Sequence, residues 1–117
     1  MIVKRLKELD KIKITGNPKL FKKNLISEYN LKECVMFSYS ELAYREKTTK
    51  FKHKDILKFY FILSGQCNFN INSNELLLKK DDLILIEPNE KYFLENKNKT
   101  LNKHLYAGFL IKDFKIR

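Results

Sequence analysis

Short runs of apolar residues fill the middle of the chain, and turn-forming residues separate them. Between residues 59 and 96 four such runs are divided by Gly65-Gln66, Asn72-Ser73-Asn74, Lys80-Asp81-Asp82 and Pro88-Asn89. Runs of this length, rich in Phe, Tyr and Ile and spaced roughly 8–12 residues apart, are typical of antiparallel strands in a sandwich or barrel. The pattern therefore predicts an all-β fold.

Alternation within the runs predicts which face of each strand is buried. After Gly65, the apolar residues Cys67, Phe69 and Ile71 alternate with asparagines, so this strand has one buried and one solvated face. Residues 83–86 are apolar at every position, which predicts a central strand buried on both faces.

The strand before Gly65 places a lysine in an apolar setting. Period-two geometry puts Lys58, Tyr60 and Ile62 on one face and three apolar side chains on the other. A buried lysine is costly unless it is paired or its pKa falls. Lys58 therefore either meets an anionic partner, reaches the mouth of the barrel, or is exposed near the start of its strand.

The C-terminal part and the region before residue 59 give further strands. Residues 33–40 and 42–49 are predicted to be two strands, and residues 104–111 the last clear one. Gly108 inside that last strand indicates a bulge or a close backbone approach. Residues 112–117 are either a final strand or a frayed end.

The N-terminal part has no single preferred structure. Residues 1–12 have apolar residues at helical spacing, although residues 11–15 fit a strand equally well, and residues 20–29 are ambiguous. We therefore divide the chain into an N-terminal arm, residues 1–30, and one barrel domain, residues 31–117. The arm either covers one mouth of the barrel or takes part in dimerisation.

Composition restricts the class of protein. A chain of 117 residues forms one domain with a real core, and 44% apolar residues argue against disorder. The formal net charge of +10 suggests a nucleic-acid partner, but 21 lysines and only three arginines carry the positive charge. Arginine forks are the usual readers of bases and phosphates. We interpret the lysines as a solvated surface and expect no nucleic-acid partner from this chain alone.

Cysteine usage and hydropathy predict the cellular setting. Cys34 and Cys67 form no close motif, so we expect buried free thiols in a reducing compartment. The N-terminus is too charged for a signal peptide, and no apolar run approaches ~18 residues. The sequence thus predicts a cytoplasmic protein without a membrane partner.

Two motifs resemble those of the cupin superfamily. The run from Phe59 to Gly65 is similar to the cupin strand that ends in glycine. About 16 residues later, the sequence Asp81-Asp82-Leu83-Ile84-Leu85-Ile86-Glu87-Pro88-Asn89 resembles the second cupin motif. The resemblance covers residues 51–96 and implies a cupin-type double-stranded β-helix, a jelly-roll barrel.

The departures from the cupin motifs concern the metal ligands. Metal-binding cupins resemble one another in supplying two histidines and a glutamate around the first motif and one histidine from the second. In this chain only His53 remains, Lys58 holds the glutamate position and Tyr92 the second-motif histidine position, while Asp81 and Asn89 replace two glycines. An ammonium group has no lone pair for a metal. The resemblance therefore implies a barrel without a metal or other cofactor.

Residues 76–96, with the run LKKDDLILIEPNE, most closely resemble the N-terminal effector-binding domain of AraC-type transcription regulators. That family senses small molecules, often sugars, through a metal-free barrel and dimerises beside it. The resemblance implies a ligand-sensing domain without its DNA-binding part, or a stand-alone small cupin that binds a ligand. Since cupins commonly pair through sheet faces, it also implies a homodimer.

We predict a ligand site formed by five residues: His53, Lys58, Tyr60, Tyr92 and Tyr106. Aromatic walls with a few polar tips suit a small organic ligand. The cationic Lys58 favours a carboxylate, a phosphate or an acidic sugar. A lone histidine among lysines is, alternatively, a surface residue.

Two other functions fit the sequence. A metal-independent isomerase or epimerase would use His53 and Tyr92 as base and acid, although no carboxylate that would orient His53 is evident. A basic module could bind nucleic acid or protein through lysine-rich strand edges. Lysine on an edge strand also prevents edge-to-edge pairing.

Overall fold

A computed structural model describes residues 1–29 and 31–111. Within them, one 3-10 turn and ten strands follow one another: η1 (Leu6–Glu8), β1 (Ile12–Ile14), β2 (Asn17–Asn24), β3 (Cys34–Leu42), β4 (Phe51–Lys52), β5 (Ile56–Ser64), β6 (Gln66–Ile71), β7 (Asn74–Lys79), β8 (Leu83–Ile86), β9 (Lys91–Glu95) and β10 (Asn102–Leu110). Residues 112–117, predicted as a last strand or a frayed end, lie outside the described residues.

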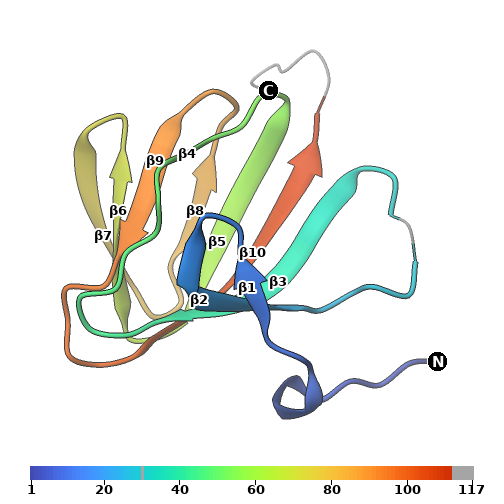
Figure 1. The fold of residues 1–117 in the computed structure, drawn as a ribbon. Coiled ribbons are helices and arrows are strands. Elements are labelled where there is room, and N and C mark those ends of the chain that lie inside the picture. The colour runs from blue at the N-terminus through green and yellow to red at the C-terminus, as the bar shows by residue number, and fades with distance from the viewer. Residues whose placement is uncertain (30, 112–117) are drawn as a thin grey trace.

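The strands form two antiparallel sheets that face each other (Figure 1). The larger sheet has the order β1-β2-β3-β10-β5-β8, and the smaller one the order β4-β9-β6-β7. Strands distant in sequence are therefore neighbours, with β10 lying between β3 and β5. Two packed sheets with such crossovers form a jelly roll. The structure confirms the predicted all-β, cupin-type fold.

The inner faces of the two sheets form the core. On β6, Cys67 and Phe69 are completely buried, as the alternation predicted. On β5, Tyr60 and Ile62 point inward with Lys58, while Phe59 and Phe61 lie on the outer face. The predicted division of both strands into two faces is confirmed.

Residues with positive φ make the tight turns. Asn72 and Ser73, with φ of 49° and 73°, close the two-residue hairpin between β6 and β7. Asp81 and Asn89, which occupy the two glycine positions of the cupin motifs, also have positive φ, 72° and 69°. Asp and Asn tolerate this left-handed region. The chain therefore keeps the cupin turns although it lacks these two glycines.

Two strand predictions were wrong in part. Residues 42–49 do not form a strand: β3 ends at Leu42, and Arg45 turns the chain with a φ of 68°. The backbone N–H of Arg45 then donates to the carbonyl of Asn96. In this region only a single bridge, from Lys47 to Glu95, joins the loop to β9.

The strand β8 is an edge strand, although its four apolar residues predicted a central one. Leu83 and Leu85 are each 56% exposed, whereas Ile86 is buried. Continuous apolar sequence therefore marks one core-facing side and one apolar outer side, because periodicity alone cannot tell burial from an apolar surface.

Of the two structures that the N-terminal sequence allowed, the strand forms at Ile12–Ile14 and no α-helix forms in the described residues before it. Ile12–Ile14 pair with β2, and the 3-10 turn is only three residues long. The Nζ of Lys23 donates to the carbonyl of Leu6 at 2.7 Å, which holds this turn against β2. Strand β2 (Asn17–Asn24) pairs with β3 and so belongs to the larger sheet.

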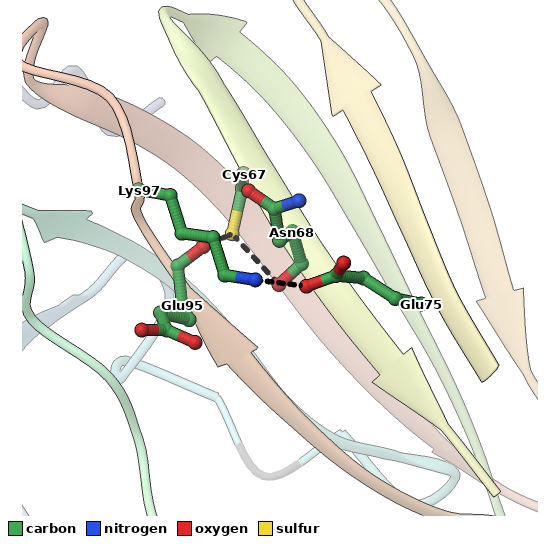
Figure 2. A network of polar contacts seen from close by, with 5 residues as sticks. All are labelled: Cys67, Asn68, Glu75, Glu95 and Lys97. Atoms are coloured by element: carbon green, nitrogen blue, oxygen red, sulfur yellow. Dashed lines mark hydrogen bonds and ion pairs between the residues drawn. The ribbon is translucent and has the colours of Figure 1, made fainter. Parts of the chain in front are cut away.

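A small polar network links the loop after β9 to β7 of the smaller sheet (Figure 2). Lys97, in the loop after β9, forms an ion pair with Glu75 of β7. Beneath it, the Cys67 thiol lies 3.8 Å from the carbonyl oxygens of Asn68 and Glu95. Both cysteines are free, and burial raises the pKa of Cys67 to about 12; Cys34 is only half-buried.

No helix among residues 1–29 and 31–111 combines the length and the hydropathy that a membrane crossing requires.

Candidate ligand-binding site

A cavity of about 310 Å³ lies between the two sheets. β1, β2, β3, β5 and β10 of the larger sheet line it, together with Phe51 of β4 and Leu94 of β9. Ile14, Leu20 and Lys22 come from the N-terminal strands, so these strands form part of the cavity wall. The volume suits a small organic molecule.

Lys58 lines this cavity from β5. Its strand, β5, lies between β8 and β10, where Lys58 is opposite Ile86 and Gly108. Only 5% of the residue is exposed. Its Nζ lies 5.0 Å from the ring centres of Phe51 and Tyr106.

Two more rings complete the surroundings of this ammonium group. The Nζ of Lys58 is 5.3 Å from the ring centre of Tyr60 and 5.6 Å from that of Tyr92. No hydrogen bond or ion pair joins Lys58 to another described residue, and no Asp or Glu is among the residues that line the cavity. Cation–π contacts with four rings therefore replace the usual carboxylate.

The cavity is electropositive. Burial lowers the pKa of Lys58 to about 8, and the charge of Lys22 lowers it further. Burial, and then the charge of Lys58, lowers the pKa of His53. A site with two lysines and no carboxylate stabilises a bound anion.

A chain of hydrogen bonds runs along one wall of the cavity. The Oη of Tyr92 lies 3.3 Å from Nε2 of His53 and 3.4 Å from the Oη of Tyr60. Burial raises the pKa of both tyrosines, so the phenols stay protonated. When Nε2 of His53 carries no proton, it accepts a hydrogen bond from the Oη of Tyr92, which in turn accepts one from the Oη of Tyr60.

His104, on β10 beside Tyr106, is a neutral imidazole. Burial lowers its pKa to about 3, and the charge of Lys58 contributes. Its Nδ1 is 2.8 Å from Oδ1 of Asn102, whose amide donates to the carbonyl of Ser64. Because Asn102 presents an oxygen, Nδ1 carries the proton and Nε2 keeps its lone pair.

The structure brings the five predicted site residues together. His53, Lys58, Tyr60 and Tyr106 line the cavity, whereas Tyr92 is only 1% exposed and contacts them from behind the wall. Whether they bind a ligand stays a prediction. His53 is half-buried with its ring 6.0 Å from that of Phe51.

Among the cavity residues that the sequence analysis missed, three bear on the chemistry of the cavity. His104 was detectable, since it shares a strand face with Tyr106. Phe51 alternates with His53 in the segment where the cupin resemblance expects ligands. Lys22 had no signal in the sequence, because its segment was ambiguous and only the pairing with β3 turns it inward.

The cavity residues do not fit a metal ion. Two imidazoles, His53 and His104, line the cavity, but so does the ammonium of Lys58, and the described lining residues include no carboxylate. Divalent metals need neutral imidazole and carboxylate donors. Among the described residues there is no group of three or more His, Cys, Asp or Glu that could hold a metal.

The jelly roll and its aromatic-lined cavity define a small barrel of the cupin type. The chain belongs to the family described as the AraC-like ligand binding domain, whose model matches residues 35–104. A comparison with curated proteins found no match.

Solved structures share the fold at low sequence identity. The chain is similar to a predicted oxalate decarboxylase from Thermotoga maritima, with a TM-score of 0.84, 22% identity, and coverage of 94% of this chain and 100% of that one. It is also similar to the Cnp3 cupin domain of Schizosaccharomyces pombe, with a TM-score of 0.78, 16% identity and coverage of 97% and 83%. These likenesses show the fold alone.

Proposed function

We propose that this domain senses a small organic anion, which binds in the cavity with its charged group against Lys58. The observation that carries the proposal is the buried ammonium of Lys58, which lines the cavity and has no carboxylate partner among the described residues. A carboxylate, a phosphate or an acidic sugar would supply the missing charge. Lys22 lies close enough to lower the pKa of Lys58, and the same anion would relieve that repulsion.

Membership of the AraC-like ligand binding family supports the proposed sensing role. The match to the AraC-like ligand binding domain supports a domain that binds a small molecule. The buried cationic Lys58, surrounded by four rings, supports a ligand that is both organic and anionic. We propose that ligand occupancy in the cavity is passed on through the N-terminal strands, because Leu20 and Lys22 belong both to the cavity wall and to β2. The free cysteines fit the cytoplasmic setting that we propose for this domain.

The isomerase alternative has less support. A base and an acid must lie on either side of a small molecule. His53 and Tyr92 are instead hydrogen-bonded to each other, and Tyr92 does not line the cavity. The pair is better suited to hold the wall of a binding site.

Thermal unfolding tests the proposal. A panel of carboxylates, phosphates and acidic sugars is compared with neutral sugars and with Zn, Fe and Mn ions. A ligand at a hundredfold excess over its Kd raises Tm by roughly 10 °C in a domain of this size. We expect a shift with an acidic compound and none with metals.

Two variants test whether the ligand-induced shift in Tm arises at Lys58. Lys58→Met should abolish the shift, because it removes the charge that pairs with the anion. Lys103→Met, an exposed lysine on β10, should retain it. A shift that survives Lys58→Met would contradict the proposed site, and a clear shift with a metal would contradict the metal-free barrel.

We also propose a homodimer that forms through the outer face of the larger sheet. Leu83 and Leu85 of β8 are each 56% exposed, and Val35 of β3 is 47% exposed. On the same face, Phe59 and Phe109 stack with ring centres 5.7 Å apart. A contiguous apolar sheet face of this kind is typical of a protein interface.

A further inference from the structure

Lys58 has the surroundings of a nucleophilic amine. Its Nζ faces the cavity, and no described residue binds it by a hydrogen bond or an ion pair. An exposed lysine is almost fully protonated near neutral pH, whereas burial lowers the pKa of Lys58 to about 8. At neutral pH about a tenth of this amine therefore carries the free lone pair that a nucleophile requires.

Proton carriers lie beside the amine. Tyr60, Tyr92 and His53 form a continuous series of hydrogen bonds, with 3.4 Å and 3.3 Å between successive polar atoms. Rings of this series surround the amine, since the Nζ of Lys58 is 5.3 Å from the centre of Tyr60 and 5.6 Å from that of Tyr92. Half-buried His53 ends the series nearer to solvent.

We infer that Lys58 captures its ligand covalently, as a reversible Schiff base with an aldehyde or ketone that also carries an anionic group, such as a 2-oxo acid. The inference rests on the proposed anion-binding function and names the ligand class. Lys22, which also lines the cavity, is the cation that binds the anionic group once Lys58 has reacted.

The reaction needs no further reagent. The lone pair of Nζ attacks the carbonyl carbon, the carbonyl oxygen takes up a proton, and the nitrogen loses one, which gives a carbinolamine. Its C–O bond then breaks, the oxygen leaves as water with a second proton, and a C=N bond remains. Tyr60 and His53, which line the cavity, exchange these protons.

The aromatic surroundings also favour the product. A protonated imine keeps the positive charge on the nitrogen of Lys58. The rings of Phe51, Tyr60, Tyr92 and Tyr106 therefore stabilise it as they stabilise the ammonium. An aqueous imine lacks this environment and hydrolyses readily, so capture is expected at Lys58 and not at exposed lysines.

Reductive trapping tests the inference. The protein is incubated with limiting glyoxylate and cyanoborohydride, and peptide mass spectrometry locates the reduced adduct. We expect Lys58 to carry at least about ten times more adduct than exposed Lys103, because its amine is less protonated. Lys58→Met should lose the fast labelling and keep the slow background.

Glycolate separates this inference from the proposed function, because it has the same carboxylate and a hydroxyl in place of the aldehyde. If both compounds raise Tm but Lys58 gains no adduct, the Schiff base is overturned and anion binding stands. If neither binds and Lys58 reacts no faster than Lys103, both are overturned. If Lys58→Met does not fold, the ratio of adduct at Lys58 to adduct at Lys103 in the wild-type protein decides whether the Schiff base forms at Lys58.

Discussion

Four aromatic rings let a charged residue stay inside the barrel. Lys58 is 5% exposed, and its ammonium lies 5.0–5.6 Å from the ring centres of Phe51, Tyr60, Tyr92 and Tyr106. Each ring presents the negative face of its quadrupole, so the group loses water but keeps an electrostatic partner. Burial, and then the charge of Lys58, lowers the pKa of the two histidines nearby, His53 and His104.

His104 makes the fold sensitive to acid. Its pKa is about 3 in the folded protein and about 6.5 in an unfolded chain, so below pH 6.5 only the unfolded state takes up the proton. The contribution of His104 to stability is therefore present above pH 6.5 and is lost as the pH falls toward 3. Between pH 7 and pH 5 the loss amounts to roughly 2 kcal/mol.

The comparison with His104→Gln measures this effect by urea unfolding at both pH values. The variant should lose less stability on acidification than the wild type, because it lacks the titrating group. His53, whose pKa is also lowered, acts equally in both proteins. Equal losses in the two proteins would contradict the neutral, buried state of His104.

At the level of elements, the turns determine how the two sheets face each other. β5 belongs to the larger sheet and β6 to the smaller one, and Gly65 alone separates them. Gly65 has a φ of 69°, and a Cβ at this position would lie 2.5 Å from the carbonyl oxygen of Leu101. The loop before β10 thus packs directly on this glycine.

Gly65→Ala should reduce the free energy of unfolding by about 3 kcal/mol or more, because it adds both backbone strain and a clash with main chain. Gly16→Ala is the matched control. Gly16 has a φ of 78°, but the nearest atom to its Cβ would be the Thr49 hydroxyl at 3.7 Å, so only strain remains, about 1 kcal/mol. Chemical denaturation measures both, and equal losses would show that the clash is relieved.

At the scale of the whole molecule, the outer face of the larger sheet carries apolar side chains that a monomer would leave exposed to water. The apolar side chains of β8 lie beside those of β5 on this face, since Leu85 pairs with Phe59 and Leu83 with Phe61. The lysines, which give the chain its net charge of +10, are spread over most of the sequence. A second copy can therefore cover the apolar face without bringing one dense block of charge together.

Sedimentation at micromolar concentration should show a dimer, and the double variant Leu83→Lys with Leu85→Lys should be a monomer. A lysine at the centre of an interface would be a buried charge without water or a partner. The free energy that this desolvation costs exceeds what the remaining apolar contacts contribute to association. Leu76→Lys is the control, because Leu76 is a comparably exposed leucine, 48%, on β7 of the smaller sheet. A wild-type monomer, or a dimer that the double variant preserves, would contradict the proposed interface.

The sequence by itself determined the strands of the central region, their faces and the cupin turns, because alternation and turn residues act locally. Cys67 and Phe69 are buried and Asn72-Ser73 closes a hairpin for reasons that are visible in their neighbours. The same local pattern was misleading at β8, where an apolar outer face has no signature different from a buried one.

Only the tertiary structure decided which residues form the cavity. The ring of Phe51, the ammonium of Lys22 and the imidazole of His104 come from three different strands that long-range pairing brings to Lys58. The same packing decided that Tyr92 lies behind the cavity wall and that Lys58 is buried with no carboxylate of the described residues paired to it. Charge and burial depend on neighbours in space, and the spacing of residues along the chain does not contain them.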